Sequence, residues 1–209
     1  MPLVIATSNP GKVDELRHLL PEGIRLLSIR DLGITLPAET GSSYLENAVM
    51  KAAFAAKTGH AALADDSGLE IDALDGAPGV RSARFAREGA TDAENNEKAV
   101  QSLVATSGAP RTARFRSVVV LITPDGRQFV GNGSIEGNFV KVPRGLSGFG
   151  YDPHFELDDP LTPAENGKTI AELTDTQKNS ISHRARAVES LLTAIEAAET
   201  SLSELTGDR

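Results

Sequence analysis

The stretch Ala61-Ala62-Leu63-Ala64-Asp65-Asp66-Ser67-Gly68 is the most informative in the chain. Residues 61–64 form a short apolar run, after which come two adjacent acids and a Ser-Gly pair. This pattern predicts a buried strand that ends in a tight turn. Because neighbouring residues of a strand point to opposite faces, the two acids are expected to have different roles. Carboxylates at a strand end are costly unless they are paired, solvated or bound to a cation, although acids are also common in ordinary turns.

The flanking sequence predicts an α/β or α+β protein with a mixed sheet, because strands and helices do not alternate regularly. The expected elements are a strand at Leu3–Thr7, a turn at 8–11, a helix from Val13, a helix at 43–57, a strand at 69–71, a helix with a Thr91–Glu94 capping box, a hairpin of strands 114–123 and 128–130, and a long closing helix that carries Ile181 to Ile195. One domain of residues 1–199 is expected. Residues 200–209 form a polar tail that is expected to fray.

The helix expected at residues 43–57 carries both apolar and polar side chains of interest. Its predicted buried side consists of Leu45, Ala48, Val49, Ala52 and Ala56. Asn47 and Lys51 lie off that stripe, and their spacing of four residues places them on one face of the helix.

The composition excludes several classes of protein. The chain has 209 residues, 40% of them hydrophobic and 24% charged, which is typical of a soluble globular protein. A net charge of −8 argues against nonspecific binding to nucleic acid or to an anionic membrane. Without cysteines there are no disulfides, zinc–thiolate sites or thiol catalysis. The first apolar run is too short for a signal peptide or a membrane span, so a cytoplasmic location is expected.

A possible anion site joins the first strand to the first helix. This segment is Thr7-Ser8-Asn9-Pro10-Gly11-Lys12. Backbone N–H groups at a helix N-terminus attract anions, and Lys12 adds positive charge there. The segment lacks the longer glycine loop of a Walker A motif. An ordinary capped turn remains the alternative.

Glu39 becomes chemically interesting only if it meets Asp66 across a metal ion. Mg²⁺ typically takes one or two carboxylates, and substrate phosphates and waters complete its octahedron. Asp66 and Glu39 together would meet that need. The alternative is that Glu39 is a solvated loop acid and that Asp65 and Asp66 are a pair of turn acids.

Two later segments suit a nucleotide. Phe149-Gly150-Tyr151-Asp152 places two aromatic rings in a glycine-flanked loop, where they either stack on a base or cap the core. Ser182-His183-Arg184 opens the last helix shortly after Lys178. A serine there is normally a cap, but a His-Arg pair beside a lysine also suits a purine carbonyl and phosphates.

Taken together and in order, these motifs resemble the inosine triphosphate pyrophosphatase family, in its bacterial dITP/XTP branch. The resemblance runs from about Val4 to Val188 and rests on ATSNPGK, ETGSSYLENAVMKA, ADDSGLE, GAPGVRSARFA, PRGLSGFGYDP, and KTIAEL followed by QKNSISHRA. It implies an elongated mixed α/β sheet flanked by helices, in two lobes with a nucleotide cleft between them, and a homodimer.

The resemblance also implies roles for individual residues. Glu39 and Asp66 would hold Mg²⁺, and Asp66 would also accept a proton. Lys51 and Asp65 would support catalysis. The implied nucleotide contacts are Thr7, Ser8, Asn9, Pro10, Gly11, Lys12, Ser67, Phe149, Gly150, Tyr151, Asp152, Lys178, His183 and Arg184. His183 and Arg184 are expected to donate hydrogen bonds to the C6 carbonyl that hypoxanthine and xanthine carry.

The expected activity is hydrolysis of deaminated purine nucleoside triphosphates (ITP, dITP, XTP) to the monophosphate and pyrophosphate, which would cleanse the nucleotide pool. One alternative is a Maf-type pyrophosphatase that acts on other bases, against which the Ser-His-Arg segment argues. The other is a nucleotide sensor without catalysis, against which the acids Glu39, Asp65 and Asp66 argue.

Overall fold

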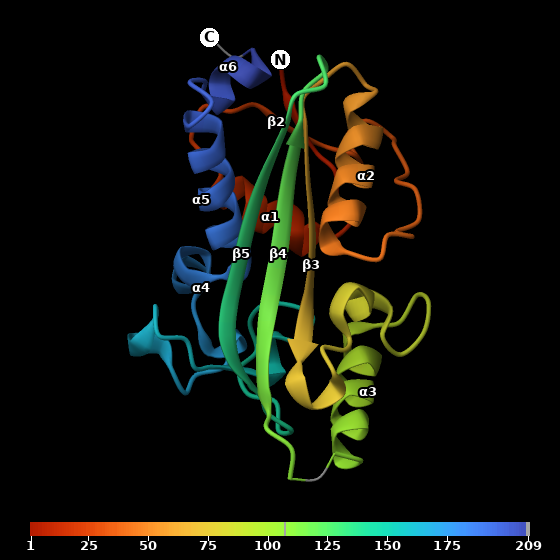
Figure 1. Ribbon diagram of the computed structural model, residues 1–209, viewed down its shortest axis with the longest axis vertical. Coiled ribbons are helices and arrows are strands. Elements are labelled where there is room, and N and C mark those ends of the chain that lie inside the picture. Colours follow the sequence, from red (N-terminus) through yellow and green to blue (C-terminus); the bar gives the residue numbers. More distant parts are fainter. Residues whose placement is uncertain (107, 208–209) are drawn as a thin grey trace. The chain divides into compact units, whose positions relative to one another are not determined.

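The computed structural model describes residues 1–106 and 108–207, which contain one mixed six-stranded sheet (Figure 1). Its strands are β1 (Leu3–Ile5), β2 (Leu26–Ser28), β3 (Ala62–Ile71), β4 (Thr112–Ile122), β5 (Gln128–Phe139) and β6 (Phe155–Leu157). The α-helices are α1 (Pro10–Leu19), α2 (Tyr44–Ala56), α3 (Asp92–Val104), α4 (Asp175–Ile181), α5 (His183–Glu196) and α6 (Leu202–Thr206). Short 3₁₀ helices lie at Asp72–Leu74, Gly79–Arg84, Asp152–His154, Pro163–Glu165 and Ile170–Glu172.

The sheet combines parallel and antiparallel pairing, which confirms the predicted mixed α/β class. Its strand order is β2-β1-β3-β4-β5-β6. β1 is parallel to both β2 and β3, with Val4 opposite Ala62, whereas β5 is antiparallel to β6. β4 and β5 are neighbours joined by a short turn at residues 123–127, as the hairpin prediction required.

The chain divides into two compact units, and each is discontinuous in sequence. Unit 1 contains Met1–Asp66, Ser117–Gly133 and the described residues from Arg184 onward. Unit 2 contains Ser67–Arg116, apart from residue 107, and Ser134–His183.

Unit 1 buries apolar side chains on both faces of its part of the sheet. Leu63 packs in a cluster with residues of α1 and α5, whereas Ala62 and Ala64 pack in a second cluster with residues of α2. Because the side-chain period of a strand is two, Asp65 continues the face of Leu63 and Asp66 continues the face of Ala64. The strand therefore directs the two acids toward different helices.

Unit 2 has a core of its own, to which α3 contributes Ala99 and Leu103. α3 begins with the predicted capping box, in which the side chains of Thr91 and Glu94 each accept from the other's backbone N–H. Tyr151 and Phe155 fill the same core.

The predicted turn at Asp65 and Asp66 is wrong, because both residues lie inside one continuous strand, β3. Side chains supplied by other elements pair with both carboxylates, as described below, so the backbone does not have to turn them out to water. The predicted strand at residues 69–71 is the second half of the same strand. The closing helix also differs from the prediction, because it is interrupted at Ser182 between α4 and α5.

The predicted buried face of α2 is partly wrong. Leu45 is 43% exposed, whereas Asn47 and Lys51 are buried together with Ala48 and Ala52. The predicted fraying of the tail is wrong for residues 200–207, because residues 202–206 form α6, whereas residues 208 and 209 of that tail lie outside the described residues. Its leucines, at positions 202 and 205, join the core of unit 1.

Candidate active site

The loop that joins β1 to α1 has the predicted form of a capped helix start. Asn9 is the N-cap, and its side-chain oxygen accepts from the backbone N–H of Lys12 at 3.3 Å. Thr7 Oγ1 accepts from the N–H of Asn9 at 3.3 Å, and Arg30 Nη2 donates to the carbonyl of Ser8 at 3.2 Å. These contacts fix the loop at the positive end of the α1 dipole.

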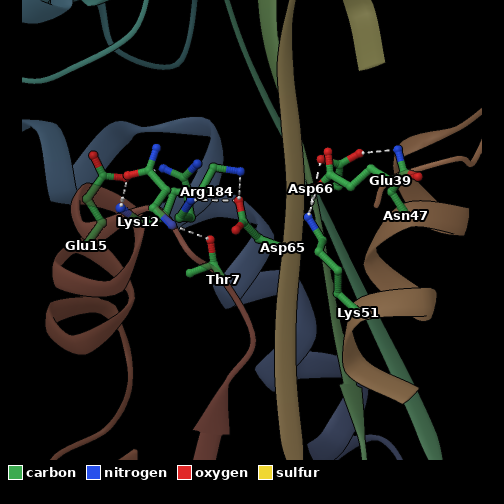
Figure 2. Close-up of polar contacts among 10 residues, drawn as sticks. Thr7, Lys12, Glu15, Glu39, Asn47, Lys51, Asp65, Asp66 and Arg184 are labelled. Atoms are coloured by element: carbon green, nitrogen blue, oxygen red, sulfur yellow. Dashed lines mark hydrogen bonds and ion pairs between the residues drawn. The ribbon is translucent and has the colours of Figure 1, made fainter. Parts of the chain in front are cut away.

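Asp65 lies on the α1 and α5 side of β3 between two cations (Figure 2). Its Oδ2 is 3.0 Å from Lys12 Nζ and 3.1 Å from Arg184 Nε. Glu15 of α1 binds the opposite end of the same guanidinium through Nη1. Two positive and two negative groups therefore balance, and Asp65 and Arg184 are 0% and 1% exposed. This balance explains how four charges are tolerated in or near the core.

Asp66 projects from the opposite side of β3 toward α2 (Figure 2). Its Oδ2 accepts from Asn47 Nδ2 at 2.9 Å, and its Oδ1 is 3.6 Å from Lys51 Nζ. Lys51 also donates to Glu39 Oε1 at 2.5 Å. One ammonium thus faces two carboxylates, so this cluster carries one formal negative charge more than positive charge.

The two sides of β3 shift the pKa values of the adjacent acids in opposite directions. Burial raises the pKa of Asp65, but Lys12 and Arg184 outweigh it and hold that pKa well below its ordinary value. Burial also raises the pKa of Asp66, and the nearby carboxylate of Glu39 raises it further. Lys51 and, less strongly, Lys12 lower that pKa, but not enough to reverse the rise. Neighbouring carboxylates with separated pKa values are typical of an anchor and a base.

The excess negative charge beside Asp66 fits a divalent cation. Asp66 and Glu39 supply carboxylate oxygens, the donors that Mg²⁺ prefers. Among residues 1–106 and 108–207 there is no cluster of three or more His, Cys, Asp or Glu that could hold a metal ion. Such a two-carboxylate site leaves most of the octahedron to phosphate oxygens and water, as is usual for Mg²⁺ in nucleotide enzymes.

Asn47 is the member of this site that the sequence analysis did not assign. Its Nδ2 donates to Asp66, while its Oδ1 accepts from the backbone N–H of Gly41 at 2.8 Å. A Cβ at position 41 would lie 2.6 Å from that oxygen, so only glycine allows the approach. Asn47 thereby ties the loop that follows Glu39 to Asp66. The sequence signal for this role was the position of Asn47 four residues before Lys51, on the same face of the helix.

Within unit 2 the structure brings Phe149, Asp152 and Lys178 together. Lys178 Nζ is 2.7 Å from Asp152 Oδ2 and 4.5 Å from the centre of the Phe149 ring. The same Asp152 oxygen accepts from the backbone N–H of Phe149 at 3.0 Å. The aromatic ring, the carboxylate and the ammonium thus form one connected group.

Three further predicted nucleotide contacts, Tyr151, His183 and Arg184, are buried as well. Tyr151 takes the core alternative, since it is 5% exposed and donates to the carbonyl of Ser82 at 2.9 Å. His183 stacks on Phe115 with ring centres 4.8 Å apart. Arg184 forms ion pairs with Asp65 and Glu15. The hydrogen bond from its guanidinium to the C6 carbonyl of a purine stays a prediction.

The same chain matches a known family over nearly its whole length. Residues 3–194 match the model of the Ham1 family. The chain belongs to the Ham1 family.

Family members with similar sequences cover most of the chain. A Thermus thermophilus protein named dITP/XTP pyrophosphatase is 47% identical, over 93% of this chain and 91% of its own. An Escherichia coli protein of the same name is 44% identical, over 92% and 97%. The solved structure of a HAM1 protein from Coxiella burnetii superposes with a TM-score of 0.82 at 39% identity, covering 94% of this chain and 99% of that one. The family predicted from the sequence motifs is therefore confirmed.

Across the described parts of the chain, no helix has the length and apolar character needed to cross a membrane.

Proposed function

We propose that this Ham1-family protein hydrolyses deaminated purine nucleoside triphosphates, such as ITP, dITP and XTP, to the monophosphate and pyrophosphate. The observation that carries the proposal is the contrast between the surroundings of the two adjacent acids. Asp65 lies between two cations, whereas Asp66 lies in a cluster with excess negative charge. The names of the similar bacterial proteins support the same activity.

In the proposed reaction, water attacks the α-phosphorus. The bond from that phosphorus to the oxygen bridging the α- and β-phosphates breaks, and pyrophosphate leaves with the bridging oxygen. Asp66 accepts the proton of the attacking water, for which its raised pKa suits it. Lys12 and the amides at the start of α1 hold phosphate oxygens, and Lys51 stabilises charge beside Asp66.

The residues that would hold Mg²⁺ are Glu39 and Asp66. A bound Mg²⁺ would neutralise charge on the phosphates and orient them. Lys51 occupies the space between these carboxylates, 2.5 Å from one and 3.6 Å from the other. It would turn toward phosphate oxygens when a cation takes over the carboxylates.

Base recognition is assigned to unit 2, where Phe149 supplies a ring for stacking and Lys178 a cation beside it. His183 is the predicted donor to the C6 carbonyl. The predicted cleft, the homodimer and the cytoplasmic location stay predictions.

A nucleotide panel with Mg²⁺ tests the proposal when pyrophosphate and orthophosphate are quantified separately. ITP, dITP and XTP should release pyrophosphate much faster than ATP and GTP. Stepwise release of orthophosphate through a diphosphate would overturn attack at the α-phosphorus. Preference for another base would favour a Maf-type enzyme, and tight ITP binding without turnover would favour a sensor.

A further inference from the structure

The loop that carries Phe149 is held by α3 through the backbone N–H and carbonyl of a single residue, Gly150. Asp92 Oδ2 accepts from the backbone N–H of Gly150 at 2.7 Å. Asn96 Nδ2 donates to the carbonyl of the same glycine at 2.9 Å. Asp92 and Asn96 are four residues apart, so they share one face of the helix. Together they satisfy the only donor and the carbonyl acceptor of Gly150.

Gly150 is the point at which this loop changes direction. Its φ of 62° lies in the left-handed region that favours glycine. On one side of it, Phe149 is tied to Asp152, and on the other, Tyr151 is anchored in the core. Hydrogen bonds to the Gly150 N–H and carbonyl therefore fix both the position and the tilt of the loop that presents the Phe149 ring.

α3 is a suitable anchor because it is itself firmly held. Its first turn has a reciprocal capping box between Thr91 and Glu94, and its buried side packs Ala99 and Leu103 into the core of unit 2. Asp92 and Asn96 thus connect a rigid helix to a loop whose side chains carry the proposed base contacts.

We propose that Asp92 and Asn96 are positioning residues that set the affinity for the purine base by holding the backbone of Gly150, and through it the Phe149 ring. The proposal rests on the proposed function, because it requires Phe149 to stack on the base. Neither residue touches the reacting atoms, which the chemistry assigns to unit 1. Their loss should therefore weaken substrate binding without slowing the chemical step.

The test compares alanine and near-isosteric variants at both positions. Asp92→Ala and Asn96→Ala should each raise the KM for ITP about two- to twelvefold, the range of one lost hydrogen bond, with kcat nearly unchanged. Asp92→Asn keeps an acceptor oxygen and should restore a KM close to wild type. Asn96→Asp places a carboxylate oxygen against the Gly150 carbonyl and should be at least as harmful as alanine. Glu97→Ala is the matched control, because Glu97 is an exposed neighbour on α3 whose side chain accepts a hydrogen bond from Gln101 and does not contact Gly150.

Two further readouts separate positioning from a general loss of structure. Melting temperatures identify variants that fail to fold. The inhibition constant of pyrophosphate, which has no base, should stay at the wild-type value in every folded variant. A parallel rise in that constant, an unchanged KM in both alanine variants, or the same KM rise in Glu97→Ala would each overturn the proposal.

Binding of inosine monophosphate, measured by calorimetry, keeps the test independent of turnover. If the wild-type protein binds this nucleotide but does not hydrolyse ITP, the proposed function fails, while weaker binding in Asp92→Ala and Asn96→Ala would still support the positioning role. If hydrolysis is normal and both variants bind like the wild type, the positioning role alone fails.

Discussion

Replacing each of the adjacent acids with asparagine should separate stability from activity. Asp65→Asn removes the charge that lies 3.0 Å from Lys12 and 3.1 Å from Arg184, at a position that is 0% exposed. Arg184 would keep Glu15, but Lys12 would lose the carboxylate that lies 3.0 Å from its ammonium. Breaking a buried pair by removing one partner typically costs about 3–5 kcal/mol. For a chain of this size, that corresponds to a melting temperature lowered by about 6–20 °C.

Asp66→Asn makes the same chemical change one residue later and should have the opposite signature. It leaves Lys51 with Glu39, one positive and one negative group, so the excess negative charge disappears. Because burial raises the pKa of Asp66, its charged form does not stabilise the fold, and the asparagine variant should melt within a few degrees of wild type. Loss of the proposed base should lower kcat about 10²–10⁴-fold, and a weakened Mg²⁺ site would add to that.

The assay is pyrophosphate release from ITP at saturating Mg²⁺, with thermal melting of the same preparations. We expect Asp66→Asn to be stable and inactive and Asp65→Asn to be destabilised. A folded Asp66→Asn with near-normal kcat would refute the assignment of the base. Equal losses of melting temperature in both variants would refute the distinction between the two faces of β3.

Further outcomes follow from the same contacts. Since the pKa of Asp65 is held below its ordinary value, the ionised carboxylate stabilises the fold above about pH 4, and this effect is lost progressively as the pH falls further. The difference in free energy of unfolding between wild type and Asp65→Asn should therefore shrink as the pH falls below about 4, which urea titrations at several pH values would detect. Glu39→Gln should raise the Mg²⁺ concentration for half-maximal activity, and an unchanged titration would remove Glu39 from the metal site. Asn47→Ala removes a hydrogen bond that lowers the pKa of Asp66, so the acidic limb of the kcat/KM profile should move to higher pH. Gly148→Ala would place a Cβ 2.1 Å from Asp152 Oδ2, so it should raise the KM for ITP more than the apparent Kd for Mg²⁺; equal changes would argue against a local effect.

Local pattern was enough to predict the roles of several elements. The apolar run before Asp65 predicted a buried strand, and the period of two predicted opposite faces for the two acids. The Asn-Pro-Gly start of α1 and the capping box of α3 were also readable, because a cap involves residues only a few positions apart. These features depend on neighbours in the sequence.

The errors arose where partners are distant in the sequence. A turn was predicted because two acids and a Ser-Gly pair follow the apolar run, yet Arg184, 119 residues away, pairs with Asp65 and allows it to lie inside the strand. On α2, the apolar stripe placed Leu45 inside and Lys51 outside, whereas the charges on β3 bring Lys51 inward. The core position of α6 likewise depends on contacts with the beginning of the chain.

The composition of unit 1 has a consequence for the order in which the protein can fold during synthesis. Its core contains Leu3 and Ile5 of β1 together with Val188 and Leu191 of α5, so β1 cannot complete its packing until α5 has been synthesised. Unit 2 draws only on residues 67–183 and has its whole core available earlier. On a ribosome, the segment that bears Asp65 and Asp66 would stay without Arg184 until α5 emerged. Conditions that slow translation near residue 184 should therefore prolong exposure of the apolar side chains of β1 that share a core with α5, which chaperone binding to stalled chains would reveal.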